Sequence, residues 1–358
     1  MRVHCYEKLE DLPSSYKAVF TQAEHISYDC SFCWFQNLFA TTFGLHENIR
    51  IFVADDENGR IAILPMYSHA DNWIKPKIIK AATNFYTSLY SPICSDELTA
   101  ELLAQALQPI KGSQMHWDVV EFSPLAAGSA SYEALFDALT MLGYRTFRYF
   151  SFANWYLTVG GRSYADYFNA LPSRLKNTVN RKRRHFFATK GARLEIIVGG
   201  QKLDRGVADY INVYNTSWKV REPFPDFMPG LIKLCADQGW LRLGLAYIDD
   251  QPIAAQLWIV AHGRAAIYKL AHDKNLESYS IGSVLTAHIM RHVIDLDKVY
   301  EVDYLIGDDD YKKDWMSHRR ERWGIVAYNP ATFLGWTCAI KQSLGELRRR
   351  IFSYVGWK

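Results

Sequence analysis

The segment Ala265–Trp315 reads AAIYKLAHDKNLESYSIGSVLTAHIMRHVIDLDKVYEVDYLIGDDDYKKDW, and it decides the fold. An apolar strand ends in charged residues and is followed by a polar loop that closes on the small-residue turn Ser280–Ser283. A helix comes next, and then a second apolar strand, which ends in Asp303 and a run of acids before Tyr311 and two lysines. A strand, a small-residue loop and a helix N-terminus together present backbone N–H groups to an anionic ligand. The segment therefore predicts an anion-binding unit.

The composition is typical of a globular protein with two domains. The chain has 358 residues, of which 49% are hydrophobic and 22% charged, and this argues against extended disorder. Aromatic residues make up 15% of the chain, and such residues fill cores or line clefts for sugars, acyl chains or bases. The net charge of +3 is too small to indicate a nucleic-acid-binding protein from bulk charge, and no DNA partner is expected.

We expect no secretory signal at the N-terminus, because Arg2, His4 and Glu7 interrupt any apolar run. No stretch reaches the length of a membrane span without a charge, so we expect a soluble, cytoplasmic protein. Cys30 and Cys33 form one CxxC, but no second CxxC or CxxH completes a zinc site. We therefore expect reduced, half-buried thiols and no metal.

Strand and helix patterns alternate along the first half of the chain. A hairpin is predicted around Asp56–Gly59, where Asn-Gly supplies the turn. The predicted helices are 32–44, 97–110 and 129–142, and the predicted strands are 49–55, 60–69, 77–83, 117–122 and 151–159.

The second half repeats this pattern around a second hairpin, which turns at Asp249–Gln251. Two similar α+β domains in tandem, with mixed and mostly antiparallel sheets, follow from the repeated order. The predicted helices are 172–190, 203–218 and 280–295, and the predicted strands are 193–198, 241–248, 252–261, 264–271, 299–306 and 322–328.

The last segment, 330–358, is predicted to be a terminal helix, because its apolar residues recur at helical spacing. Arg348–Arg350 lie next to Phe352, Tyr354 and Trp357. Such a basic and aromatic end suits peripheral contact with an anionic membrane face. It equally suits a helix that is docked on the protein with its basic end in solvent.

Three stretches carry a resemblance to a known family. They are LGLAYIDDQPIAAQLWIVAHGRAAIYKLAHD, SYSIGSVL and VDYLIGDDDYKKDW. Together they resemble the GNAT acyltransferase fold, and within it the FemAB-related, BioF2-like acetyltransferase domain, a branch that includes proteins of bacterial polysaccharide and cellulose biosynthesis. The resemblance runs from about Pro172 to Trp323, with a weaker similarity at 30–44. It implies an N-terminal GNAT-like domain at 1–155, a BioF2-like acyltransferase domain at 156–329, and a helical tail at 330–358.

The resemblance implies a place for the donor. In such enzymes the strands that correspond to 264–271 and 299–306 part, and the pantetheine arm of acyl-CoA pairs with the exposed strand edge. The pyrophosphate would meet the helix start at Ile281, Gly282 and Ser283, and the hydroxyls of Ser280 and Ser283 would cap the helix or donate. The superfamily's Gln/Arg-x-x-Gly-x-Gly/Ala signature is absent, and Glu277 lies where a basic residue would help.

Candidate catalytic residues cluster at the two strand ends. Asp303 lies in an apolar strand and is expected either to act as base or orient the acceptor amine, or to be a salt-bridged structural residue. Tyr311 matches the position of the superfamily's general-acid tyrosine, although a packed aromatic ring is an open alternative. Lys269 is expected to polarise the carbonyl or hold phosphate, and His272 and Asp273 to lie on the same rim.

Three further residues are expected to bind substrate, namely Trp218, Arg221 and Lys312. A packed Trp218 is the alternative. The acids Asp308–Asp310 are expected to charge a helix N-terminus rather than to bind a metal, because consecutive residues on a turn rarely converge on one ion. The segment Ser173–Lys190 has seven Lys or Arg and no acid, which predicts either phosphate recognition or a solvated basic helix face.

The predicted function is direct transfer of an acyl group from acyl-CoA, or a related thioester, to an amine or hydroxyl of a cell-envelope or polysaccharide precursor. Acyl-CoA would be a co-substrate, and no permanently bound cofactor is expected. Two alternatives stay open. One is a FemAB-type transferase that uses aminoacyl-tRNA, which the basic helix and the missing signature favour, and the other is a non-catalytic accessory protein of polysaccharide biosynthesis.

Overall fold

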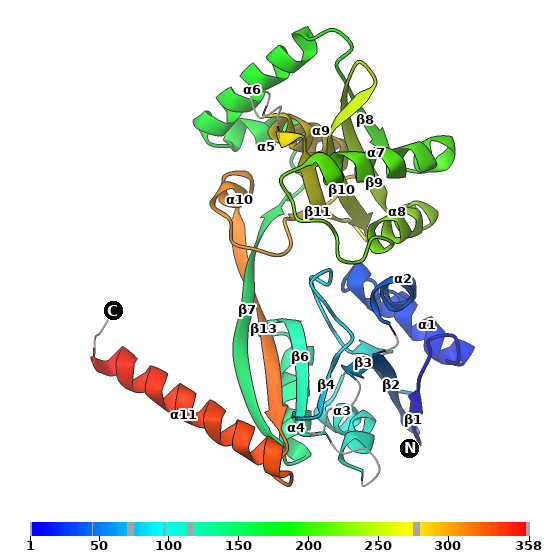
Figure 1. The fold of residues 1–358 in the computed structure, drawn as a ribbon, viewed down its shortest axis with the longest axis vertical. Helices are drawn as coiled ribbons and strands as arrows, with labels where there is room; N and C mark the ends of the chain where they lie inside the picture. The colour runs from blue at the N-terminus through cyan, green and yellow to red at the C-terminus, as the bar shows by residue number, and fades with distance from the viewer. Residues whose placement is uncertain are drawn as a thin grey trace. The chain divides into compact units, whose positions relative to one another are not determined.

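The computed structural model describes residues 2–44, 46–69, 75–95, 98–112, 117–274 and 280–355, with side chains as far as Arg348. The chain forms two compact units (Figure 1). The first unit comprises Met1–Gln36, Phe43–Ser151 and Glu321–Lys358, and the second comprises Asn37–Thr42 and Phe152–Arg320.

The strands of the first unit follow the order β1-β2-β3-β4-β6-β13, with β5 beside β3. β4 and β6 are parallel, and the other described pairs in this unit are antiparallel. The strands are β1 (Arg2–Tyr6), β2 (Glu47–Asp55), β3 (Ile61–His69), β4 (Ile78–Ala81), β5 (Ile93–Cys94), β6 (Val119–Ala126) and β13 (His318–Tyr328). The helices are α1 (Ser14–Ala23), α2 (Phe32–Thr42), α3 (Ala100–Ala106), α4 (Ala130–Met141) and α11 (Phe333–Val355).

The turn between β2 and β3 shows why this hairpin forms where the sequence predicted it. The Asp56 carboxylate accepts hydrogen bonds from the backbone N–H groups of Asn58 and Arg60, both at 2.9 Å. Gly59 has a φ of +79°, a left-handed conformation that glycine adopts without steric cost. Fully buried apolar side chains, among them those of Phe52 and Leu64, form the core on the sheet behind this turn.

The second unit is built on the strand order β7-β12-β11-β10-β9-β8. Its parallel pair is β11–β12, and its other described pairs are antiparallel. The strands are β7 (Arg145–Thr158, of which the part up to Ser151 belongs to the first unit), β8 (Arg193–Ile197), β9 (Leu241–Ile248), β10 (Gln251–Ala261), β11 (Arg264–His272) and β12 (Glu301–Asp303). The helices are α5 (Tyr164–Ala170), α6 (Ser173–Ala188), α7 (Leu203–Thr216), α8 (Phe227–Asp237), α9 (Ile281–Asp295) and α10 (Asp310–Trp315).

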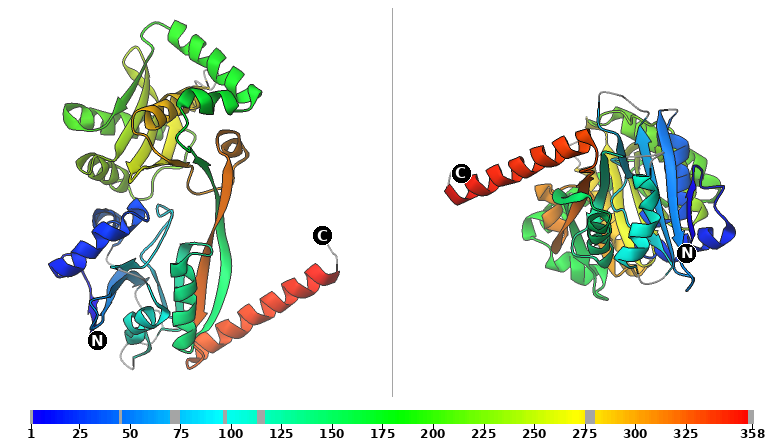
Figure 2. Two further views of the ribbon diagram at one scale, coloured as in Figure 1. Left: turned by 180° about the vertical axis from the view of Figure 1, so that it is seen from behind. Right: turned by 90° about the horizontal axis from the view of Figure 1, so that it is seen from below.

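Helices cover both faces of the sheet in the second unit (Figure 2). The side chain of Leu243 lies against Gly206 of α7, whereas the next residue, Gly244, meets Ile289 of α9. Successive residues of a strand point to opposite faces, so α7 and α9 cover opposite sides.

The two central strands of the second unit pair and then part. β11 and β12 are in register only from Arg264 with Glu301 to Ala266 with Asp303. β12 also pairs with β7, and this pairing continues beyond Asp303, where the N–H of Tyr304 donates to the carbonyl of Trp155 at 2.9 Å. β11 continues to His272 on its own course. This is the parting of strands that the resemblance implied.

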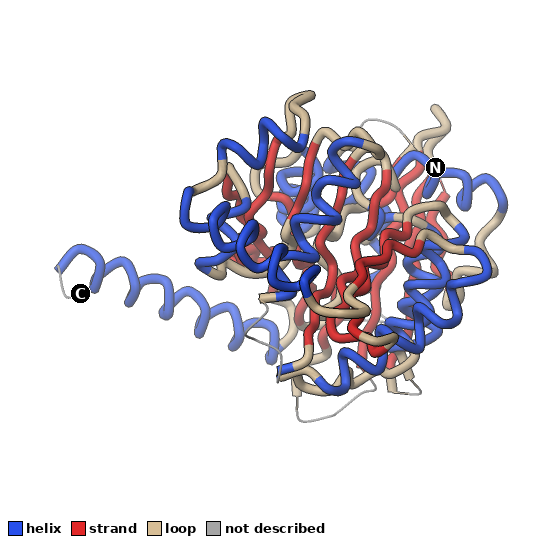
Figure 3. Tube along the Cα trace, turned by 90° about the horizontal axis from the view of Figure 1, so that it is seen from above, coloured by secondary structure: helices blue, strands red, loops and turns tan. Residues whose placement is uncertain are grey.

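The predicted fold class is confirmed: both units are mixed, mostly antiparallel α/β structures, and the last described segment is the helix α11. Figure 3 shows α11 as one uninterrupted helix. No helix in the described part of the chain is long and apolar enough to span a bilayer. The predicted domains 1–155 and 156–329 are continuous segments of the sequence. The first compact unit is not continuous, because it also includes the chain from Glu321 onward.

Five helices and strands were not predicted, namely β1, β5, α1, α5 and α8. α5 has only seven residues, too few for a helical period to be recognised. α8 follows a segment rich in proline and contains Pro229 and Gly230, which the sequence reading takes as breakers. The strand predicted over 299–306 shortens to Glu301–Asp303, and Leu305 just beyond it has a left-handed φ of +54°, which a strand does not adopt.

Gly244 tests the contact between β9 and α9. A Cβ atom there would collide with the Ile289 side chain, which is fully buried and would have to shift. We expect Gly244→Ala to lower the free energy of unfolding by about 1–3 kcal/mol, the usual cost of overpacking. Urea denaturation followed by circular dichroism measures it.

The matched control is Gly345→Ala in α11, where an added Cβ meets nothing within 4 Å. That change should be neutral or stabilise the protein by up to about 1 kcal/mol, because alanine favours a helix. Equal effects of the two substitutions would contradict the packing described for Gly244.

Candidate functional site

Among the described residues, no side chain caps the first turn of α9. Ser280 precedes the helix in the left-handed conformation, with φ 44° and ψ 42°, and its side chain makes no capping hydrogen bond. The Ser280 hydroxyl therefore does not cap the helix, which was one of its two predicted roles. The first N–H groups of a helix have no partner inside it, and they carry the positive end of the dipole.

A buried amide fixes this turn against the sheet. Gln256 of β10 is 1% exposed, and its Nε2 donates to the carbonyl of Gly282 and to the Thr286 hydroxyl, both at 2.9 Å. The indole Nε1 of Trp258 donates in turn to Gln256 Oε1 at 3.0 Å. The chain Trp258–Gln256–Gly282 thus fixes where α9 begins relative to β10.

The end of β11 lies beside the same turn. A Cβ atom on Gly282 would be 3.6 Å from His272 Nδ1, so these two residues are neighbours. The His272 ring lies 4.3 Å from the Trp218 ring, centroid to centroid. Trp218 is 52% exposed, so it is not a packed core residue. Sequence reasoning placed all three at the site, and the structure brings them together.

Lys269 lies at the same end of β11 and is paired. Its Nζ donates to Glu222 Oε1 at 3.0 Å, and both side chains are largely buried. Glu222 comes from the loop between α7 and α8. A salt bridge so well shielded from water holds the loop against the strand end.

Lys219 is a functional candidate that sequence reasoning missed. Burial lowers the pKa of Lys219 to about 8, and the nearby charges of Lys269 and Lys312 lower it further, while that of Glu222 raises it. Three lysines from the α7–α8 loop, β11 and α10 therefore share one electrostatic environment. One weak signal for Lys219 was present in the sequence, its position next to Trp218. The charges that shift its pKa, those of Lys269 and Lys312, lie about 50 and 90 residues away.

Tyr311 stands at the start of α10 with its ring 47% exposed. The ring packs edge-on against the buried ring of Tyr304, with centroids 5.8 Å apart. Burial and the negative charge of Asp309 raise the pKa of Tyr311 to about 12, so the phenol keeps its proton at neutral pH. Such a group is a donor of the kind that a leaving thiolate needs.

Lys312 is buried and has internal partners. It is 5% exposed, and its Nζ donates to the carbonyl of Ile306 at 2.6 Å and lies 3.1 Å from the Asp309 carboxylate. Lys312 therefore holds the turn from β12 to α10, and within that turn Gly307 has a φ of +109°. Its role toward substrate stays a prediction.

Asp303 is held by internal partners. Asn154 and Arg320 both donate to its carboxylate, and the backbone N–H of Leu305 donates at 2.7 Å. Arg320 also bonds to Glu301, at 2.9 Å from its Nη2. Donors from three residues hold this carboxylate in one orientation. This matches the structural alternative stated for Asp303, and the role of base stays a prediction.

The remaining predicted residues lie at or beyond the rim. Arg221 is exposed in the α7–α8 loop. Asp273 follows β11, and its N–H donates to the carbonyl of Ile253. Asp308 accepts from Trp155 Nε1 at 2.6 Å and pairs with Arg319 at 3.0 Å. Glu277 lies outside the described residues.

Comparisons with known proteins agree with this geometry. Residues 173–313 match the acetyltransferase (GNAT) domain family, a range that contains the α9 turn, the lysines and Tyr311. No curated protein matches the sequence. The functional assignment therefore depends on the domain match and on the fold.

Several solved structures share the fold. FemX has a TM-score of 0.58 at 8% identity, covering 91% of this chain and 97% of that one. L-PGS from Bacillus licheniformis has a TM-score of 0.51 at 10% identity, with coverages of 94% and 97%. A tandem GNAT protein from the clavulanic acid biosynthesis pathway scores 0.51 at 8% identity, with coverages of 92% and 100%. At these identities the likeness shows a tandem GNAT-like fold alone.

Lys219 offers a direct test of the site's electrostatics. After reductive methylation with ¹³C-formaldehyde, we expect the Lys219 resonance to titrate near pH 8. Lys269→Met should raise this pKa toward that of a free lysine, because it removes a like charge and releases the Glu222 carboxylate. Nuclear magnetic resonance follows the titration.

The control is Lys233→Met on the exposed side of α8, which removes the same charge elsewhere in the second unit. The pKa of Lys219 should be the same in this variant as in the native protein. An ordinary lysine pKa for Lys219 in the native protein would contradict the electrostatic environment described.

Proposed function

We propose that this protein is an acyltransferase that moves an acyl group from acyl-CoA, or a related thioester, to an amine or hydroxyl of a cell-envelope or polysaccharide precursor. One observation carries the proposal: β11 and β12 pair over three residues and then part beside the uncapped first turn of α9. A pantetheine arm suits an opened strand pair, and a pyrophosphate suits a helix start. The BioF2-like, polysaccharide-associated branch belongs to this proposal.

In the proposed reaction the acceptor amine attacks the thioester carbonyl carbon, and the C–S bond breaks. The Ser280–Ser283 turn would bind the pyrophosphate through backbone N–H groups other than that of Ser283, which donates to the Ser280 carbonyl at 3.0 Å. Lys269 would stabilise the negative charge that develops on the carbonyl oxygen. Tyr311 would donate its phenolic proton to the leaving thiolate. Lys219, with a pKa of about 8, is neutral in part at physiological pH and would take the proton from the acceptor ammonium.

The other predicted residues support this chemistry from outside. Asp303 would act as a positioning residue, because its bonds to Asn154 and Arg320 fix the end of β12 that leads to Tyr311. His272 and Trp218, in ring contact, would line the acceptor side with Arg221 and Asp273 at the rim.

An aminoacyl-tRNA donor is the alternative that one observation favours. α6 carries exposed basic residues, among them Arg174, Arg181 and Arg184, of the kind that bind a phosphate backbone. A non-catalytic accessory role would need neither donor.

Acetyl-CoA binding separates these readings. We expect calorimetry to detect saturable binding of acetyl-CoA by the native protein, and Gly282→Trp to weaken it at least about tenfold. The indole would occupy the space above the first turn of α9, where the pyrophosphate is proposed to bind. Gly345→Trp, where nothing lies within 4 Å, is the control and should bind normally.

Absence of binding to any acyl-CoA would overturn the donor assignment. Salt-sensitive binding of aminoacyl-tRNA in its place would establish the alternative donor. If the protein binds neither acyl-CoA nor aminoacyl-tRNA, the accessory role is favoured.

Tyr311 is expected to act on turnover and not on donor binding. Tyr311→Phe should lower the rate of CoA release by about 100-fold or more, which is typical for loss of a general acid, with acetyl-CoA affinity unchanged. A thiol-reactive dye measures release in the presence of a panel of amino sugars and amino acids. Tyr300→Phe, at an exposed tyrosine, is the control. Equal rates for the two variants would rule out the acid role.

Membrane contact by α11 is a separate part of the proposal. Its exposed apolar residues recur every three or four positions and so share one helix face. The basic run Arg348–Arg350 follows them. This combination suits an anionic lipid surface. The exposed residues are Phe333, Trp336, Ile340, Leu344 and Leu347.

We expect the full chain to sediment with phosphatidylglycerol vesicles and not with phosphatidylcholine vesicles. The double change Leu344→Asn and Leu347→Asn should reduce this binding several-fold, because it removes apolar area that the bilayer would bury. Gln342→Asn, on the same helix, should leave it unchanged. Failure of the native chain to sediment would disprove the contact.

A further inference from the structure

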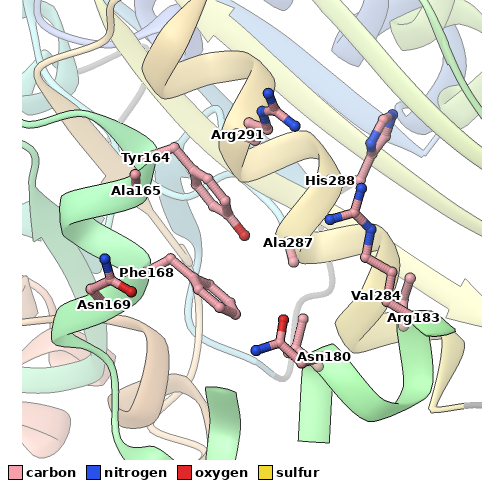
Figure 4. A pocket seen from close by; sticks show the side chains of 11 residues that line it. Tyr164, Ala165, Phe168, Asn169, Asn180, Arg183, Val284, Ala287, His288 and Arg291 are labelled. Atoms are coloured by element: carbon pink, nitrogen blue, oxygen red, sulfur yellow. The ribbon is translucent and has the colours of Figure 1, made fainter. Parts of the chain in front are cut away.

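A cavity of about 270 Å³ lies in the second unit among α5, α6 and α9 (Figure 4). Side chains from all three helices line it, and neither the strand parting nor Tyr311 belongs to it. Among those that line it are Tyr164, Phe168, Asn180, Arg183, His288 and Arg291. The volume is near the lower end for ligand sites, so it suits a ligand of one small ring and its substituents.

Three cationic or titratable side chains gather at this cavity. Arg183 of α6 reaches toward His288 of α9, and Arg291 lies one turn further along α9 (Figure 4). Burial lowers the pKa of His288, and the positive charge of Arg183 and then the charges of His292 and Arg291 lower it further. The site therefore carries a positive potential that repels a proton from His288.

Little negative charge offsets this potential. Asp295 lies 3.8 Å from Arg291 and one turn away on the same helix, and an exposed pair of this kind is weak. The same carboxylate also accepts the backbone N–H of Tyr164 at 2.8 Å. No ion pair is recorded for Arg183 within the described ranges of the chain. An anionic ligand would supply the missing charge.

The rest of the lining suits an uncharged, hydroxylated body. The rings of Tyr164 and Phe168 stack with centroids 5.5 Å apart and form an aromatic wall from α5. The amides of Asn169 and Asn180 face the cavity from α5 and α6 and offer both donors and acceptors (Figure 4). An aromatic wall with amides beside it is a surface on which a sugar ring packs and hydrogen-bonds.

We propose that this cavity binds a phosphate monoester on a small hydroxylated body, such as a sugar phosphate, with its phosphate against Arg183, His288 and Arg291. Arginine binds phosphate in a bidentate manner, and a protonated histidine adds a charge-assisted hydrogen bond. The inference goes beyond the proposed acyl transfer and stands without it.

The site is distinct from the proposed donor site on α9. Val284, Ala287, His288 and Arg291 occupy successive turns of one face of the helix. Ile289, on another face, packs on Gly244 of β9. From Ile281 to His288 the helix rises about 10 Å, at 1.5 Å for each residue.

Calorimetry with three probes tests the proposal: inorganic phosphate, glucose 6-phosphate and glucose. We expect glucose 6-phosphate to bind more tightly than inorganic phosphate, and glucose to bind weakest. Arg183→Gln should weaken both phosphate probes by about tenfold, which is typical of losing a charge-assisted contact. Arg181→Gln removes the same charge from the same helix but does not line the cavity, and it should bind as the native protein does.

A second readout separates the cavity from general electrostatic attraction. Bound phosphate should raise the pKa of the His288 imidazole, measured by nuclear magnetic resonance and assigned with His288→Gln. Arg183 and His288 are both accessible to solvent, so we expect Arg183→Gln and His288→Gln to keep the fold, which circular dichroism will check. Absence of saturable phosphate binding by the native protein, or equal weakening by Arg181→Gln and Arg183→Gln, would overturn the proposal.

Discussion

The buried amide of Gln256 is the interaction on which the rest of the second unit's site depends. It ties the first turn of α9 to β10 through Gly282 and Thr286, and Trp258 fixes the amide itself. A buried amide without partners costs about 1–3 kcal/mol, so α9 has one favoured position on the sheet. That position brings Gly282 to His272 at the end of β11, the strand that parts from β12 beyond Ala266.

Much of the fold follows from local sequence signals. The hairpin at Asp56–Gly59 is predicted because its turn chemistry is contained in four residues, and the structure shows that chemistry as bonds to the Asp56 carboxylate. Elements without a strong local signal were missed, such as α8, whose Pro229 and Gly230 oppose helix formation. Tertiary packing overrides propensity there, since Phe227 and Leu231 of α8 are fully buried.

The site was predictable in part for the same reason. Lys269 and Tyr311 stand at strand and helix ends, which the pattern locates. Lys219 was missed because its low pKa depends on charges from two other elements. Asp303 attracted attention as an acid in an apolar strand, yet the arginine that pairs with it, Arg320, is 17 residues away and on a different strand. Pairing of that kind is a property of the folded chain and not of any window of sequence.

β13 has a further consequence for how the chain is made. It supplies the strand beside β6 in the first unit, yet it comes after almost the whole of the second unit in sequence. During synthesis from the N-terminus, the second unit has all of its strands once Asp303 has emerged from the ribosome. The first unit must wait until Tyr328. The unit that begins the chain is thus the later of the two to complete its sheet, and β6 keeps an open edge while the other unit folds.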